Sequence, residues 1–275
     1  MLHRDYFNTE VRTVLHVKNL DRSLAFYQGA LELPAVYAWD EGERDRGCKL
    51  KAAGGMIELL NREPELEQGP TTIMLEADNV DDCYRRLMQK DGVAVFEHLA
   101  NRPYGILSLC LIREDPDQNV VVIFSWTRDV LEYQKGWTPA AEGFFRGEYR
   151  AVAYVGVDNY EECLAFYRDI LRLRACYTWD YGRGDRGHKF VIGRGDATLE
   201  VLCRKDPMPQ GAETLMLEAD DVDGCYASIV QKAGGRVTVL EPPADRPYGI
   251  RVFRLMDPNR NNIVIFSYLK GKEGA

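Results

Sequence analysis

The chain has 275 residues, of which 45% are hydrophobic and 28% charged, so it is long enough to form two domains with buried cores. Its formal net charge of −8 argues against nucleic acid or an anionic membrane as the main partner. Seven cysteines form no Cys-x-x-Cys pair, the N-terminus lacks the apolar run of a signal peptide, and no apolar stretch could span a bilayer. These features predict a cytoplasmic protein.

The first element is a strand at 11–17, indicated by its β-branched residues and its alternation. Asn19 or Asp21 can cap the helix that follows, in which apolar residues recur at helical spacing. Three strands come next, then a second strand and helix within 71–90, then three more strands. The expected strand ranges are 34–39, 46–53, 56–61, 92–98, 105–112 and 119–126.

The second half of the chain repeats the first. The stretch from Thr71 to Tyr84 returns as Glu213 to Tyr226, with 10 of 14 positions identical, and each copy reads as a strand running into a helix. The second repeat begins with a strand at 150–157. Each repeat therefore contains the order βαβββ twice, and the chain contains four such modules. We predict one domain at 1–126, a linker at 127–148, and a second domain at 149–275.

A polar motif also occurs in both repeats. The pattern Tyr-x-Trp-Asp-x-Gly-x-x-Asp-Arg-Gly-x-Lys begins at Tyr37 and again at Tyr177. Its retention predicts the same local turn in both halves. Asp45 and Arg46 can serve that turn through a hydrogen bond or an ion pair, with no ligand implied.

Three features together resemble the vicinal oxygen chelate superfamily, which includes glyoxalase I, bleomycin-resistance proteins, extradiol dioxygenases and methylmalonyl-CoA epimerase. They are the four modules, the pattern V-x-x-L-D-R-S-L-A-F-Y that begins at Val17, and the turn from Asp115 to Asn119. The resemblance implies an α+β fold of four βαβββ modules in two tandem glyoxalase-like domains. It also implies that paired modules curl around a cleft, with helices on the convex side. One fold hosts many activities, so the function has to come from the site.

Enzymes of that superfamily hold a divalent metal with one residue from each of four strands, commonly His or Gln, Glu, His and Glu. Residues at the corresponding positions here are Arg12, Glu58, Thr72 and Val122 in the first repeat, and Val152, Glu200, Thr214 and Val264 in the second. Each set keeps one carboxylate, and no exchange of modules between repeats supplies better ligands. A guanidinium at the first position also repels a cation. We therefore expect no metal and no cofactor. Glu58 and Glu200 can contact a ligand or simply be strand residues.

Two histidines offer another route to a metal. His16 lies four residues after Arg12, on the same face of the strand, and His188 aligns with Cys48 of the first repeat. Either could form an improvised site. A strand histidine that bonds to its neighbours is the more common outcome. No P-loop, dinucleotide-binding or Gly-x-Ser-x-Gly motif is present.

Strand alternation predicts an aromatic lining for the cleft. The aromatic candidates can bind a flat ligand or can be ordinary core residues. The acidic neighbours Asp40, Asp180, Glu58 and Glu200 favour a cationic ligand, although Arg12 opposes this in one copy. The full expected ligand-binding set is Arg12, His16, Tyr37, Trp39, Glu58, Thr72, Tyr104, Val122, Tyr154, Tyr177, Trp179, His188, Glu200, Thr214, Tyr248 and Val264.

Three hypotheses follow. The first is a metal-free binding protein of the bleomycin-resistance type, which sequesters an aromatic or cationic compound as a fused pseudo-dimer or a homodimer. The second is an enzyme, a lyase, isomerase, epimerase or dioxygenase with unconventional ligands, or with Glu58 or Glu200 as a base. The third is a structural or regulatory pair of domains with degenerate clefts. Metal content separates the second hypothesis from the other two, and a bound ligand separates the first from the third.

Overall fold

The structure is a computed structural model. It describes residues 7–42, 45–62, 71–77, 79–90, 93, 95–100, 106–112, 119–126, 145–182, 184–193, 196–203 and 214–269. Tyr104, most of the predicted linker and the turn that begins at Asp115 lie outside these residues. No helix within the described residues is both long and apolar enough to cross a membrane.

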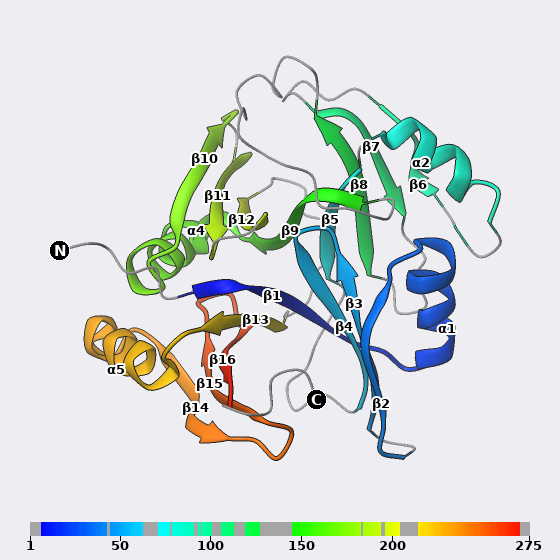
Figure 1. The fold of residues 1–275 in the computed structure, drawn as a ribbon. Helices are drawn as coiled ribbons and strands as arrows, with labels where there is room; N and C mark the ends of the chain where they lie inside the picture. Colours follow the sequence, from blue (N-terminus) through cyan, green and yellow to red (C-terminus); the bar gives the residue numbers. More distant parts are fainter. Residues whose placement is uncertain are drawn as a thin grey trace. The chain divides into compact units, whose positions relative to one another are not determined.

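The predicted module order is confirmed four times (Figure 1). Module 1 has β1 (Phe7–His16), α1 (Leu20–Leu24), β2 (Ala35–Asp40), β3 (Arg46–Ala52) and β4 (Gly55–Asn61). Module 2 has β5 (Thr72–Ala77), α2 (Val80–Leu87), β6 (Val95–Glu97), β7 (Ile106–Ile112) and β8 (Val120–Trp126). Module 3 has β9 (Phe145–Val155), α4 (Tyr160–Ala165), β10 (Arg174–Asp180), β11 (Arg186–Ile192) and β12 (Ala197–Cys203). Module 4 has β13 (Thr214–Ala219), α5 (Val222–Ala233), β14 (Thr238–Asp245), β15 (Ile250–Met256) and β16 (Asn262–Tyr268).

The strands form two eight-stranded mixed sheets. One has the order β14-β15-β16-β13-β1-β4-β3-β2, and the other has the order β10-β11-β12-β9-β5-β8-β7-β6. Module 1 therefore shares a sheet with module 4, and module 2 shares a sheet with module 3. The sequence left open whether modules pair within or across repeats, and the strand order answers that they pair across. The bounds 1–126 and 149–275 describe the repeats and remain a prediction for domains.

The chain divides into two compact units. One contains Met1–Val14, Leu66–Gly69 and Val152–Ala275, and the other contains Leu15–Glu65 and Pro70–Ala151. Each has an apolar core: Phe190 and Phe253 are fully buried in the first unit, and Leu50 and Ile57 in the second. Burial of such side chains is the main stabilising contribution in each unit.

Side-chain caps begin the helices. The Asn19 side chain accepts from the backbone N–H of Arg22 at 3.0 Å, so Asn19 rather than Asp21 is the N-cap of α1. Asn79 caps α2 in the same way, and Asp221 caps α5. These oxygens satisfy backbone donors that the first helical turn leaves without partners.

The spacing of apolar residues predicted an ordinary helix at the start of each repeat. In the structure this helix is α-helical only at its beginning and then changes to a π-helix. Ala25–Ala30 and Phe166–Ile170 are π-helical, with the N–H of Leu31 bonded to the carbonyl of Phe26 at 2.9 Å. Tyr167, which lies in the second of these turns, is fully buried and donates its hydroxyl to Asp257 at 2.6 Å. This contact ties the helical segment of module 3 to the turn before β16.

Candidate ligand-binding face

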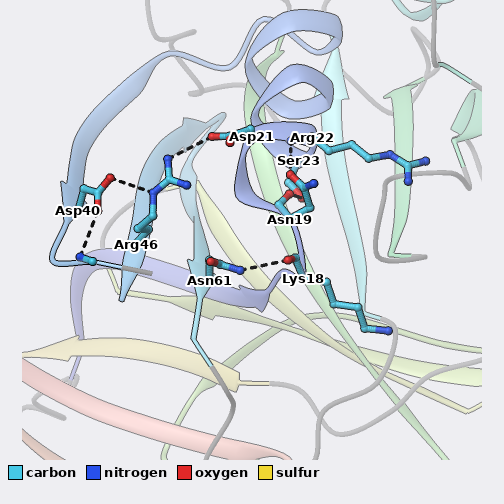
Figure 2. Close-up of polar contacts among 9 residues, drawn as sticks. Lys18, Asn19, Asp21, Arg22, Ser23, Asp40, Arg46 and Asn61 are labelled. Atoms are coloured by element: carbon cyan, nitrogen blue, oxygen red, sulfur yellow. Dashed lines mark hydrogen bonds and ion pairs between the residues drawn. The ribbon is translucent and has the colours of Figure 1, made fainter. Parts of the chain in front are cut away.

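The contacts of Arg46 show which face of the module 1 strands is covered by α1. From β3, the Arg46 side chain reaches Asp21 of α1 at 3.2 Å and Asp40 at 2.9 Å (Figure 2). Even-numbered residues of β3 therefore point toward α1, and odd-numbered residues point to the opposite side. We call that opposite side the helix-free face. Asp40 lies on the helix side with Arg46. The prediction that Asp40 helps to attract a cationic ligand is therefore wrong.

The helix-free face of module 1 carries a stacked aromatic pair. Trp39 lies directly opposite Gly47 in the β2–β3 register, and a Cβ added at Gly47 would come within 2.1 Å of the indole. Only glycine leaves room for the ring to lie there. The Tyr37 ring lies 5.9 Å from the Trp39 ring at an interplanar angle of 22°. Lys49 places its Nζ 5.4 Å from the centre of the Tyr37 ring, within cation–π range. We call Tyr37, Trp39, Lys49 and Lys51 the module 1 shelf.

Module 3 repeats this arrangement with differences. Arg186 and Glu161 of α4 are 3.0 Å apart, so the even-numbered residues of β11 face the helix. Trp179 lies opposite Gly187, where an added Cβ would come within 2.7 Å of the indole. Its ring neighbour is Tyr181, at 5.0 Å and 32°. We call Tyr177, Trp179, Tyr181 and Lys189 the module 3 shelf.

The two tryptophans bond to different acids. Trp39 donates its Nε1–H to Asp45 at 3.1 Å, which confirms that Asp45 serves the turn. Trp179 donates its Nε1–H to Glu200 at 3.0 Å. Glu200 is 5% exposed and Glu58 is 8% exposed. Each glutamate lies opposite a lysine on the neighbouring strand, Glu58 opposite Lys49 and Glu200 opposite Lys189.

The strand order collects the eight metal-ligand positions into two sets. One sheet contains Arg12, Glu58, Thr214 and Val264, and the other contains Thr72, Val122, Val152 and Glu200. Each set offers one carboxylate, alongside valine and threonine. Neither donor set fits a divalent metal, for which imidazole and carboxylate ligands are usual. Within the described residues, no group of three or more His, Cys, Asp or Glu side chains is placed to hold a metal ion.

Arg12 occupies the first of these positions and is almost completely buried. Its guanidinium lies 5.1 Å from the Phe266 ring centre, with Nη1 3.7 Å from Met216 Sδ and Nη2 3.3 Å from Tyr268 Oη. The other unit has a similar arrangement around Arg150, with a methionine and a phenylalanine in the corresponding places. That guanidinium lies 5.1 Å from the Phe124 ring, with Nη1 3.7 Å from Met74 Sδ.

Sequence reasoning missed Arg150, because aligning the repeats places Val152 opposite Arg12. Arg150 is two residues earlier, on the same face of β9, so strand alternation offered a signal that the alignment hid. Both units thus bury a guanidinium against a phenylalanine and a methionine.

The threonines at the third metal position are buried in both units. Thr214 accepts a hydrogen bond from Asn262 Nδ2 at 3.2 Å, and Asn262 is its register partner on β16. Thr72 lies opposite Val120, and its buried Oγ1 has no hydrogen-bond partner among the described residues. A buried polar atom without a partner costs free energy, and each unit contains one here, because Asn262 Oδ1 also has no hydrogen-bond partner among the described residues.

The histidines do not form a shared site. The His16 ring nitrogen lies 3.0 Å from the carbonyl oxygen of Arg62. His188 faces α4, 3.0 Å from the Tyr160 hydroxyl, and stacks against Phe190. Its expected place in the cleft lining is therefore wrong, since Lys189 and Glu200 lie on the opposite face of the sheet. Burial lowers the pKa of His188 and raises the pKa of Tyr160 to about 12.

The remaining candidate ligand-binding residues do not lie together. Tyr248 is 61% exposed at the loop before β15, and Val122 and Val264 are buried on β8 and β16. Val122 lies opposite Met74, on the face away from Ser125, whose hydroxyl accepts the Val80 N–H at the start of α2. Tyr104 lies outside the described residues, as does the side chain of Tyr154.

Comparisons with known proteins agree with this architecture. The sequence model of the Glyoxalase/Bleomycin resistance protein/Dioxygenase superfamily matches residues 11–123 and 151–265. Glyoxalase I from Zea mays is 14% identical, with a TM-score of 0.73 over 95% of this chain and 92% of that one. A dioxygenase-like protein from Bacillus subtilis subsp. subtilis strain 168 is also 14% identical, with a TM-score of 0.60 over 98% of this chain and 87% of that one. No curated protein matches the chain.

Proposed function

Because this chain belongs to the Glyoxalase/Bleomycin resistance protein/Dioxygenase superfamily, we propose that it is a metal-free binding protein that holds an aromatic small molecule. It sequesters the compound on the helix-free faces of its sheets and does not convert it. The partner is a small molecule, and the chain acts as a fused pseudo-dimer or as a homodimer. A cytoplasmic location accompanies this proposal, supported by buried cysteines that form no disulfide, such as Cys48 and Cys225.

The main observation in support of the proposal is the position of the Arg12 side chain. At the first metal-ligand position, a guanidinium is stacked on Phe266 and bonded to Tyr268, where superfamily enzymes place a neutral ligand. An arginine side chain remains protonated at any physiological pH, so it cannot offer a lone pair to a metal. Its fixed positive charge also opposes a second cation beside it.

The proposal that the ligand is aromatic rests on the solvent exposure of two tyrosine rings. Tyr37 is 39% exposed and Tyr177 is 49% exposed, and each lies on the same strand as the tryptophan of its shelf. Core aromatic residues would be covered. Rings that stay open to solvent on the helix-free face are available to stack on a planar ligand.

Elemental analysis and ligand screening of the purified full chain test the proposal together. We expect far less than one equivalent of Zn, Ni, Fe or Mn per chain, and thermal stabilisation by some planar aromatic compounds. One equivalent of such a metal, or turnover abolished by a chelator and restored by metal, would favour the enzyme hypothesis. Absence of stabilisation by every aromatic compound would favour a scaffold with unused clefts.

A further inference from the structure

We propose that modules 2 and 4 each bind the hydroxyl group of an aromatic ligand at a buried side-chain oxygen. These oxygens are Thr72 Oγ1 in module 2 and Asn262 Oδ1 in module 4. This inference rests on the proposed function and adds two things to it: the position of the site and the chemical class of the ligand, a phenol or a larger hydroxylated aromatic compound.

The two oxygens are buried and lack hydrogen-bond partners. Thr72 is 1% exposed and Asn262 is 8% exposed. Within the part of the chain that the structure describes, these are the two buried side-chain nitrogen or oxygen atoms that have no hydrogen-bond partner. Nearly all buried polar atoms of folded proteins have one, because leaving such an atom unpaired destabilises the fold. Contact with a ligand gives each of these atoms the partner it lacks.

The two oxygens also occur at equivalent places in the repeats. Thr72 and Thr214 occupy the same position in the two copies that begin at Thr71 and Glu213. Thr72 pairs with Val120 on β8, and Thr214 pairs with Asn262 on β16. The unpaired oxygen thus belongs to the threonine in module 2 and to the threonine's register partner in module 4. Its recurrence in the same pair of positions favours a shared use.

In module 4 this oxygen lies on the face of the sheet away from α5. Arg251 of β15 forms an ion pair with Asp223 of α5 at 2.7 Å, so odd-numbered residues of β15 face the helix. Met256 therefore points to the opposite face, and Asn262 shares that face because it is the register partner of Met256.

The corresponding oxygen of module 2 has the same orientation. The Ser125 hydroxyl of β8 accepts the Val80 N–H at the start of α2, so odd-numbered residues of β8 face that helix. Val120 points away from α2, and Thr72 shares its face as its register partner. Both oxygens thus lie on helix-free faces, where the proposed function places the ligand.

Methionines lie beside both oxygens. Met256 is the register partner of Asn262, and Met216 of β13 lies on the same face. Met74 lies two residues after Thr72, on the same face of β5. Because both oxygens are covered, a ligand reaches them only if a neighbouring side chain moves. Methionine has three rotatable bonds and a thioether that makes favourable contacts with aromatic rings, so it can move aside and then pack on the ligand.

The chemistry of the two oxygens identifies the ligand group. Asn262 Oδ1 is an amide oxygen, which accepts hydrogen bonds and cannot donate them, whereas the Thr72 hydroxyl does both. A ligand hydroxyl donates to either oxygen. A carboxylate or a methyl ether has no hydrogen to donate and would leave Asn262 Oδ1 unpaired.

The experiment compares 2-naphthol with 2-methoxynaphthalene, which has the same rings and no donor. Binding to the full chain is measured by calorimetry and by the methionine methyl signals in NMR spectra, assigned with Met74→Leu, Met216→Leu and Met256→Leu. We expect 2-naphthol to bind about three- to tenfold more tightly than the ether. We also expect it to shift these three methyl signals more than that of Met88, which is 48% exposed after α2.

Thr72→Val and Asn262→Val each remove one oxygen, and the second gives module 4 the residue that module 2 has at Val120. We expect each variant to weaken 2-naphthol binding at its own module about three- to tenfold, followed by the methyl signals of that module. Binding of the ether should not change. Thr72→Val should also leave the free energy of unfolding unchanged or raise it, because a methyl group replaces an unpaired hydroxyl of similar shape.

Thr13→Val is the matched control. Thr13 is a buried threonine on the face of β1 opposite Arg12, and its side chain has a polar contact. We expect this variant to lower the free energy of unfolding and to leave 2-naphthol binding unchanged, the reverse of Thr72→Val in both measurements.

Three results overturn the inference: equal affinity for the two probes, no shift of the three methionine signals, or a loss of stability in Thr72→Val like that in Thr13→Val. The last would show that the Thr72 hydroxyl already has a partner, such as a buried water. The NMR measurement on the unmodified chain keeps the test valid if a variant misfolds. Equal binding of both probes leaves the proposed function standing, whereas a stoichiometric transition metal contradicts the proposed function itself.

Discussion

Modules 1 and 3 carry the same polar motif and use its tryptophan differently. In both, the indole lies over a glycine of the next strand and a tyrosine ring lies beside it. Yet Trp39 donates to Asp45 in the adjoining turn, and Trp179 donates to Glu200 two strands away. The same local sequence therefore produces two hydrogen-bond networks.

The position of each indole over its glycine explains the difference. The atoms nearest a Cβ at Gly47 are Cζ2 and Cη2 of the six-membered ring, whereas those nearest a Cβ at Gly187 are Cε2 and Nε1. Trp179 thus holds its N–H edge over the sheet, where Glu200 lies. The motif fixes which residue the ring covers, and the surrounding side chains fix where its N–H points.

The largest expected effect concerns Gly55, whose counterpart in module 3 is Ala197. A Cβ at Gly55 would come within 2.4 Å of the Tyr149 ring, which is fully buried. We expect Gly55→Ala to reduce the free energy of unfolding by about 3 kcal/mol, toward the upper end for overpacking. Urea unfolding measures it.

Tyr149→Leu in the Gly55→Ala background should recover part of that loss, because the two residues are in contact and their effects are not additive. Ala197→Gly is the reverse control, and we expect it to cost only about 0.5–1 kcal/mol. Equal losses for Gly55→Ala and Ala197→Gly would show that the ring does not confine Gly55.

The next effect concerns the acids that hold the two indoles. Glu200→Ala removes a buried acceptor and leaves the Trp179 N–H without its partner, which should cost about 2 kcal/mol. Asp45→Ala should cost less than about 1 kcal/mol, since the Asp45 side chain is 33% exposed and water can replace it. Urea unfolding gives both values, and indole N–H signals identify the ring affected. A larger loss for Asp45→Ala would contradict the comparison.

A smaller effect is expected from the glycines beneath the rings. Gly47→Ala and Gly187→Ala both force an indole to move, but the rings lie on edge strands and can swing outward. We expect a loss of about 1 kcal/mol for Gly47→Ala and less for Gly187→Ala, because the contact at Gly47 is closer, 2.1 Å against 2.7 Å. Thermal unfolding ranks the two variants. The reverse order would mean that the indole positions do not differ as described.

Much of the fold could be predicted from the sequence, because the evidence for it is local. The copies that begin at Thr71 and Glu213 predicted two strand–helix pairs, and both form. The pairing of modules across the repeats could not be predicted. Each module presents the same kind of strand edge to any partner, so non-local packing decides which edges pair.

The candidate site was only partly predictable. Alternation correctly placed Tyr37 with Trp39 on one face, and the same rule places His188 on the face opposite Lys189. His188 was instead judged by its alignment with Cys48. Arg150 was missed because the alignment of the repeats pairs Arg12 with Val152, whereas Arg150 is the residue whose surroundings resemble those of Arg12. Whether these residues bind a ligand remains a prediction.

The smallest expected effect is a pH dependence that separates the helix sides of modules 1 and 3. His188 in module 3 occupies the place of Cys48 in module 1 and is surrounded by Tyr160, Phe190, Arg168, Glu161 and Arg186. Burial lowers its folded-state pKa, and the nearby Arg168 and Arg186 act in the same direction, while Glu161 opposes them. The unfolded chain therefore binds the proton more readily than the folded chain does.

The stability that neutral His188 contributes should be fully present above its unfolded pKa of about 6.5 and be lost as the pH falls toward its lower folded pKa. We expect the free energy of unfolding, measured by urea at about pH 8 and about pH 5, to fall less on acidification in His188→Cys than in the unmodified chain. The other three histidines are present in both proteins, so the difference between the two isolates His188. Cys48→His, the reciprocal change, tests whether the helix side of module 1 imposes the same shift. An unchanged pH dependence in His188→Cys would mean that His188 titrates alike in the folded and unfolded chain.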